Sequence, residues 1–140
     1  MEDHLHKLRS LQAQVHPFCL LCSRSNPRGL ALRFTSFSDG ILAASFQPNP
    51  TLQGYGGRLH GGVTASLLDS VMTNRLFAEG IVAVTAELKV RYRGPVAIVP
   101  EILLRAWIDK RHRPLFLMIA ELKQEDCVKA TASAKFMELK

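Results

Sequence analysis

The sequence lacks any long apolar run. No uninterrupted stretch approaches the roughly 18 to 20 residues of a membrane-spanning helix. The first four residues, Met1 to His4, are polar or charged after the initiator and lack the apolar core of a signal peptide. Internal repeats and low-complexity tracts are also missing. We therefore expect a cytoplasmic protein with no membrane partner.

Cysteine is scarce, and the number of cysteines is odd. The three are Cys19, Cys22 and Cys127, which argues against a disulfide framework. Cys19 and Cys22 have the spacing of two zinc ligands, but a second Cys or His pair is missing and only His16 lies close by. Because structural zinc normally takes four protein ligands, we expect no metal site here and a loop with two small, partly buried thiols.

Aromatic residues make up only 7% of the chain, while the formal net charge is +6. A basic chain favours anionic partners such as nucleic acid, a membrane surface or a phosphorylated small molecule. The sequence shows no helix-turn-helix spacing, zinc-finger pattern or RNA-recognition motif, and few aromatics leave few platforms for stacking bases. We therefore expect no nucleic-acid partner, and a phosphorylated small molecule is favoured.

Two basic clusters could meet such a ligand. One contains Lys89, Arg91 and Arg93, and the other contains Lys110, Arg111 and Arg113. Both stand near the ends of expected strands, where together they would suit one compact polyanion. A solvated basic surface without any ligand is the equally simple alternative.

The length and the hydropathy pattern predict one domain over residues 1–140. With 47% hydrophobic residues the chain can supply a real core. Helical spacing predicts helices at 4–15 and 61–79, and alternation predicts strands at 30–34, 41–46, 84–92, 101–111, 115–122 and 128–136. The second helix is apolar over most of its girth. We expect an α+β fold in which an antiparallel sheet curls around one long central helix.

The sequence His60-Gly61-Gly62 stands at the start of this central helix, and Asp69 lies two turns further in. Bare N–H groups at a helix N-terminus, aided by the helix dipole, can stabilise an oxyanion. A carboxylate in apolar surroundings has a raised pKa and is a stronger base or nucleophile than a solvated one. The simpler alternatives are a tight Gly-Gly turn and a polar residue with satisfied hydrogen bonds.

The separation of these groups favours a dimer. Eight residues of helix place Gly61 and Asp69 about 12 Å apart along the axis, too far for both to act on one carbonyl group. Two antiparallel helices related by a two-fold axis would place Gly61 of one subunit beside Asp69 of its partner. Symmetry would then give two identical sites per dimer.

At these residues the chain resembles the hotdog-fold acyl-CoA thioesterases related to the phenylacetic-acid-degradation and 4-hydroxybenzoyl-CoA thioesterases. The resemblance covers most of the chain. It rests on the segments Gln53–Gly62, Leu67–Asp69, Thr85, Val90–Pro95, Cys19–Cys22 and Asn26–Leu30. It implies a hotdog fold, a homodimer that can form a dimer of dimers, and acyl-CoA thioester hydrolysis. It implies no cofactor, since coenzyme A enters as part of the substrate, and no metal.

The resemblance also implies roles for single residues. The Gly61 amide, with Gly62, would polarise the thioester carbonyl, and Asp69 of the partner subunit would act as base or nucleophile. Thr73 would position water. Many relatives carry a second acidic residue after the catalytic one, where this chain has Ser70. The catalytic carboxylate is therefore expected at Asp69 alone.

The remaining expected contacts concern substrate binding. His60 would orient the glycine loop, Thr85 would line the pocket, and Gln53 would assist the carbonyl. The phosphates of coenzyme A would meet four arginines, Arg91, Arg93, Arg111 and Arg113. Two alternatives on the same fold remain open, a non-catalytic acyl-CoA binding or sensing module and a dehydratase, although dehydratases usually pair a His with an acid in a different motif.

Overall fold

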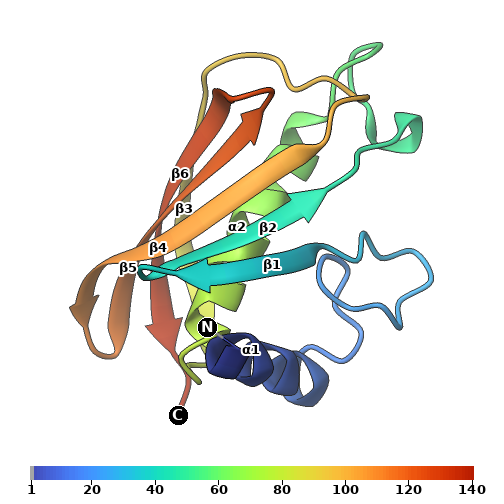
Figure 1. The fold of residues 1–140 in the computed structure, drawn as a ribbon. Helices are drawn as coiled ribbons and strands as arrows, with labels where there is room; N and C mark the ends of the chain where they lie inside the picture. Colours follow the sequence, from blue (N-terminus) through green and yellow to red (C-terminus); the bar gives the residue numbers. More distant parts are fainter. Residues whose placement is uncertain (1) are drawn as a thin grey trace.

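The computed structural model describes residues 2–140, and its elements follow the expected order (Figure 1). The helices and strands are α1 (Glu2–Val15), β1 (Arg33–Ser38), β2 (Ile41–Phe46), the short 3₁₀ helix η1 (Pro50–Leu52), α2 (Gly61–Phe77), β3 (Ala83–Tyr92), β4 (Ile102–His112), β5 (Leu115–Gln124) and β6 (Cys127–Glu138). Within these residues, no helix has both the length and the apolar character needed to cross a membrane.

The strands form one six-stranded antiparallel sheet in the order β1-β2-β4-β5-β6-β3. The sheet curves around α2, and α1 lies beside the β1 edge (Figure 1). The expected α+β architecture, a curled sheet wrapped around one central helix, is confirmed. This is the hotdog arrangement.

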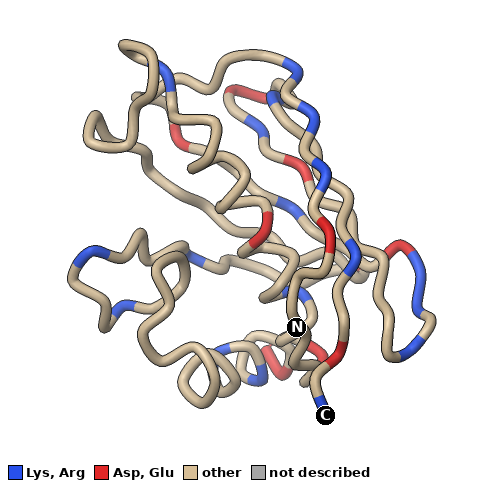
Figure 2. Tube along the Cα trace, turned by 180° about the vertical axis from the view of Figure 1, so that it is seen from behind, with Lys and Arg blue, Asp and Glu red and all other residues tan. Residues whose placement is uncertain are grey.

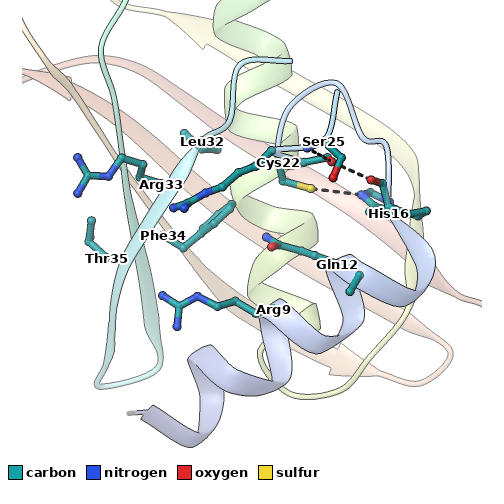
Figure 3. A pocket seen from close by; sticks show the side chains of 13 residues that line it. Arg9, Gln12, His16, Cys22, Ser25, Leu32, Arg33, Phe34 and Thr35 are labelled. Atoms are coloured by element: carbon teal, nitrogen blue, oxygen red, sulfur yellow. Dashed lines mark hydrogen bonds between the residues drawn. The ribbon is translucent and has the colours of Figure 1, made fainter. Parts of the chain in front are cut away.

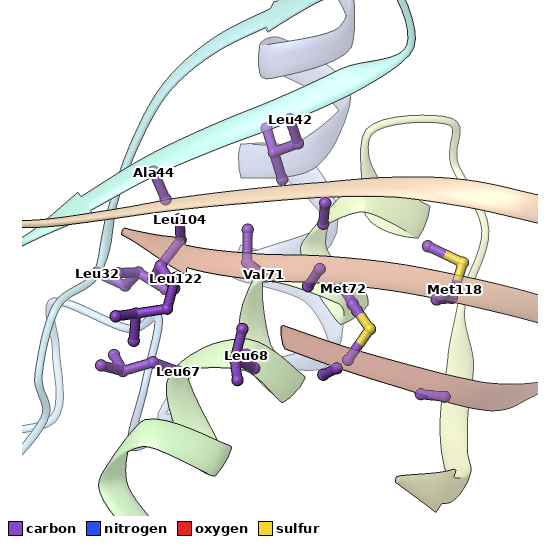
Figure 4. Packing of buried hydrophobic residues seen from close by; sticks show 14 of the residues in the cluster. Leu32, Leu42, Ala44, Leu67, Leu68, Val71, Met72, Leu104, Met118 and Leu122 are labelled. Carbon is purple, nitrogen blue, oxygen red and sulfur yellow. The ribbon is translucent and has the colours of Figure 1, made fainter. Parts of the chain in front are cut away.

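The core lies between α2 and the concave face of the sheet (Figure 4). Leu67, Leu68, Val71 and Met72 of α2 are fully buried, because the sheet covers the helix on several sides. Facing residues include Leu42, Leu104, Met118 and Leu122 from three different strands. A helix that is apolar on most of its surface is stable only when it is enclosed in this way.

Several element boundaries differ from the sequence-based expectation by one to four residues, and two of these differences have a clear cause. β1 begins at Arg33, since the N–H groups of Leu30 and Leu32 donate instead to Leu20 and Leu21 carbonyls, each at 2.8 Å. The helix α2 ends at Phe77 rather than at 79. There Gly80 adopts a φ of +78°, and the Ile81 N–H returns to the Leu76 carbonyl.

The outer strand β3 is more exposed than its alternating pattern predicts. It pairs only with β6, so its far edge is open in the single chain. Most of its residues are exposed on both faces, including Val84, Leu88 and Tyr92. Exposed apolar side chains on an open sheet edge are a liability unless another chain covers them.

A partly buried ion-pair network fixes the C-terminal end of α2. The Arg75 side chain is 4% exposed; its guanidinium donates to the Gly40 carbonyl and to Glu79, each at 2.8 Å. Arg111 of β4 binds the same carboxylate with two hydrogen bonds of 2.7 Å. These contacts, above all the one from Arg111, lower the Glu79 pKa to about 2. The helix end, the β1–β2 turn and β4 are thereby held together.

We expect Glu79→Gln to lower the free energy of unfolding by about 3 kcal/mol at pH 7, because it leaves the buried Arg75 charge without its anion. The folded-state pKa lies below the ordinary value of 4.5, so the Glu79 contribution is complete above that pH and declines toward pH 2. Urea unfolding across this range should show the difference between wild type and variant shrinking on acidification. Glu101→Gln, at an exposed position, should unfold like the wild type; a constant difference at all pH values would contradict the prediction.

Candidate active site

The N-terminus of α2 presents one free amide. His60 is the N-cap, and its Nδ1 accepts the Gly62 N–H at 2.8 Å. The His60 carbonyl accepts from the N–H groups of Val63 and Thr64. Within residues 2–140 the Gly61 N–H has no acceptor. The two predicted oxyanion donors therefore differ, since Gly61 is available and Gly62 is already engaged by His60, which agrees with a loop-orienting role for His60.

Tyr92, at the end of β3, also holds the first turn of α2 in place. Its hydroxyl donates to the Gly61 carbonyl at 2.6 Å, and its ring lies 3.6 Å from where a Cβ on Gly61 would stand. Sequence reasoning placed Tyr92 in the strand but missed this contact. No local spacing relates the two residues, which are 31 positions apart.

Asp69 meets Thr85 between α2 and β3. The Thr85 hydroxyl donates to Asp69 Oδ1 at 2.5 Å, and a register shift of β3 against β6 lies directly after Thr85. Bulges of this kind often aim a side chain toward a site. Burial raises the Asp69 pKa, while the Thr85 hydrogen bond and the nearby His16 charge partly offset that rise. Asp69 is thus a half-buried carboxyl with a fixed orientation and strengthened basicity.

The side chains of two other predicted residues, Thr73 and Gln53, form hydrogen bonds with nearby main-chain groups. The Thr73 hydroxyl donates to the Asp69 main-chain carbonyl at 3.0 Å, so its proton is not free to position water. Gln53 Oε1 accepts the Gly57 N–H at 2.9 Å within the glycine-rich loop. Both side chains lie near the region expected for them, but the structure gives them local structural contacts.

The two arginine clusters do not converge within one chain. Basic residues are spread along the trace, from the loop after α1 to the β4–β5 hairpin (Figure 2). Arg91 and Arg93 flank Tyr92 and so stand at the Gly61 end of α2. Arg111 is bound to Glu79 at the opposite end, and Arg113 is paired with Glu138. The expectation of one compact polyanion site made by both clusters is therefore wrong for the single chain.

A curved antiparallel sheet that encloses one long helix defines the hotdog fold. Residues 56–131, more than half of the chain, match the family model of the thioesterase superfamily. The chain belongs to this superfamily.

Curated relatives agree with this assignment. Acyl-coenzyme A thioesterase THEM4 of Rattus norvegicus is 29% identical over 122 residues, which cover 84% of this chain and 53% of the rat protein. The chain thus spans about half the length of the curated relatives it matches.

Solved structures with low sequence identity share the fold. The Escherichia coli PaaI protein from the phenylacetic acid degradation operon superposes with a TM-score of 0.81 at 14% identity, covering 96% of this chain and 95% of PaaI. A hypothetical thioesterase of Streptococcus pneumoniae, solved with coenzyme A, gives 0.72 at 15% identity, covering 76% and 87%. Two further structures of that pneumococcal protein carry alanine in place of an aspartate and of a threonine 16 positions later.

Proposed function

We propose that this chain hydrolyses an acyl-CoA thioester to the free acid and coenzyme A. Two observations carry the proposal: the free Gly61 amide at the start of α2, and the half-buried Asp69 that Thr85 orients further along the same helix. Asp69 and Thr85 are 16 positions apart, as are the aspartate and the threonine that were replaced in the pneumococcal neighbour. Superfamily membership and the coenzyme A bound to that neighbour also support it.

Each group has a defined role in the reaction. The Gly61 N–H, at the positive end of the helix dipole, donates to the thioester oxygen and stabilises the charge that develops there. Asp69 either removes a proton from the attacking water or attacks the carbonyl carbon itself. The C–S bond then breaks, and the coenzyme A thiolate leaves and is protonated. Water adds its hydroxyl to the acyl group, so the overall reaction is balanced.

The two groups come from different subunits in this proposal. Eight helical residues separate them by about 12 Å along α2, so a second copy must bring its own Asp69 to the first copy's Gly61. The open β3 edge, with Val84 and Leu88 exposed, supports pairing of two chains along this side. The result is a two-fold homodimer with two equivalent sites, which can assemble further into a dimer of dimers.

Arg91 and Arg93 are the phosphate contacts that this geometry favours. They lie beside the Gly61 end of α2, and no ion pair within the described residues engages them. Arg111 and Arg113 already bind carboxylates of their own chain. A bound coenzyme A would therefore place its phosphates beside the strand end of β3.

A hydrolysis screen tests the function directly. The purified chain is incubated with aromatic, medium-chain and hydroxylated acyl-CoAs, and the released thiol is measured. Turnover of at least one thioester well above the uncatalysed rate is expected. Saturable binding of acyl-CoA without any thiol release would overturn the assignment and favour a binding or sensing module on the same fold.

We expect Thr85→Val to reduce kcat by about 10- to 100-fold, because a hydrogen bond to a charged group contributes about 1.5–3 kcal/mol. The Thr85 hydrogen bond lowers the Asp69 pKa, so its loss should raise that pKa further. Since the deprotonated carboxyl is the active form, the acidic limb of the pH–rate profile should move to higher pH. Thr85→Ser should restore both properties; an unshifted profile in the valine variant would contradict the prediction.

A further inference from the structure

Three metal-binding side chains that the proposed reaction does not use meet beyond the C-terminal end of α1. His16 Nδ1 lies 3.6 Å from Cys22 Sγ, and the donor atoms of His16, Cys19 and Cys22 all lie within 4.8 Å of one another. In Figure 3 the Cys22 sulfur points toward the His16 ring. These residues are close in the sequence, but it is the conformation of the turn that brings their three donor atoms together.

The turn is built to hold two sulfurs. Cys19 Sγ accepts the main-chain N–H groups of Leu21 at 3.4 Å and Cys22 at 3.5 Å, and the Ser23 N–H donates to the Cys19 carbonyl at 3.1 Å. These hydrogen bonds fix the position of the Cys19 sulfur within the turn, where its donor atom lies close to those of Cys22 and His16.

A metal accounts for this arrangement better than a redox pair does. Cys22 is only 5% exposed, whereas reactive cysteines sit in partly exposed, electropositive surroundings. A buried thiolate needs a nearby cation to compensate its charge. A disulfide between Cys19 and Cys22 would also give His16 no role. A set of two cysteines and one histidine supplies the sulfur and nitrogen donors that Zn²⁺ prefers.

The sequence argued against a metal because a fourth protein ligand is missing. The structure shows how a different ligand could take that position. Zinc sites with three protein ligands complete their tetrahedron with water or another small donor. His16 and Cys22 line a pocket of about 720 Å³, so the fourth position has room for one. Because two thiolates neutralise Zn²⁺, the loaded site adds no net charge beside Arg9, Arg24 and Arg33, which line the same pocket.

We propose that His16, Cys19 and Cys22 bind one Zn²⁺ per chain, with the fourth coordination position open to this pocket. The metal would fasten the end of α1 to the loop that follows it. That region already contacts α2 through Gln12, which donates to Asn74 at 2.7 Å, and through the edge of the His16 ring against Phe77. The three ligands are not residues of the proposed thioesterase centre, but His16 lies near enough to Asp69 for each to influence the pKa of the other.

Metal analysis of the 140-residue chain tests this proposal. The chain is purified in reducing buffer, stripped with a chelator and titrated with Zn²⁺ under competition from a chromogenic chelator. About one equivalent is expected, and substitution with Co²⁺ should give thiolate-to-cobalt charge-transfer absorption. Cys19→Ser, Cys22→Ser and His16→Ala should each weaken binding by more than the roughly 10- to 100-fold typical of losing a second-shell partner.

Cys127→Ser is the matched control. Cys127 is an exposed free cysteine at the start of β6, and its removal should leave the stoichiometry and the cobalt spectrum unchanged. Circular dichroism shows whether each variant is folded. If Cys22→Ser does not fold, metal binding by His16→Ala and the cobalt absorption spectrum of the wild type decide the test. The proposal is overturned if the reduced wild type takes up no Zn²⁺, if cobalt binds without the charge-transfer band, or if the folded variants bind as tightly as the wild type.

Discussion

Replacing Asp69 with asparagine is expected to lower kcat for acyl-CoA hydrolysis by about 10²- to 10⁴-fold, the contribution that a positioned general base usually makes. The amide keeps the size of the carboxyl and can still contact the Thr85 hydroxyl, so the packing between α2 and β3 should survive. It cannot accept a proton from water or form a covalent intermediate. Steady-state thiol release and the binding of coenzyme A should be measured on the same preparation.

The comparison with Asp109→Asn removes the general effect of losing a negative charge. Asp109 is exposed on β4 and has no part in the proposed centre. Its variant should hydrolyse acyl-CoA like the wild type, whereas Asp69→Asn should bind coenzyme A normally and turn over very little. Undiminished hydrolysis by Asp69→Asn would remove Asp69 from the mechanism.

Replacing Gly61 with proline is expected to lower kcat by about 10²- to 10³-fold, the usual cost of losing one oxyanion donor. Gly61 is the first helical residue, where proline is favoured and where the N–H has no acceptor in the helix. His60 has φ −60° and ψ 135°, which suits a residue that precedes proline. The substitution therefore deletes the proposed donor and keeps the helix.

Gly61→Ala is the control for the added side chain. A Cβ at this position would meet the Tyr92 ring at 3.6 Å, an ordinary contact, and the N–H remains. Thermal unfolding should be similar for all three chains, while only the proline variant should lose most of its turnover. Equal activity of the proline and alanine variants would show that this amide does not stabilise the transition state.

Mixed dimers of the two inactive variants can establish whether the site is shared. In a co-expressed dimer of Asp69→Asn and Gly61→Pro chains, one site would combine the intact Gly61 of the first chain with the intact Asp69 of the second. Activity should therefore return in the heterodimer, although neither homodimer is active. If both groups of a site came from the same chain, each chain would carry one defect and no activity would return.

Local patterns in the sequence predicted most of the elements. The strand at Ile41–Phe46 and the start of α2 at Gly61 agree with the structure, because alternation, helical spacing and the glycine pair are encoded within short windows. The start of β1 could not be read in this way. Ala31 has a φ of +49°, and Leu30 and Leu32 pair with a loop instead of a strand.

For the candidate site, family resemblance and spacing could point to single residues, such as Asp69, Gly61 and Thr85, whose roles stay predictions. Contacts between distant segments were not. The bond from Tyr92 to Gly61 and the pairing of Arg111 with Glu79 join residues more than 30 positions apart, and only the register of the sheet decides them. The same holds for Gly62, because the glycine pair does not indicate that the Gly62 amide donates to the His60 ring.

Tyr92 binds the first residue of α2, and Thr85 binds the Asp69 carboxyl two turns further along that helix. Both residues belong to the edge strand β3. One strand thus helps to fix the positions of both the Gly61 amide and the Asp69 carboxyl in each chain. Slipping that strand by one residue against its neighbour would turn both side chains to the opposite face. Insertions or deletions in β3 should consequently be far less tolerated than its solvent exposure suggests.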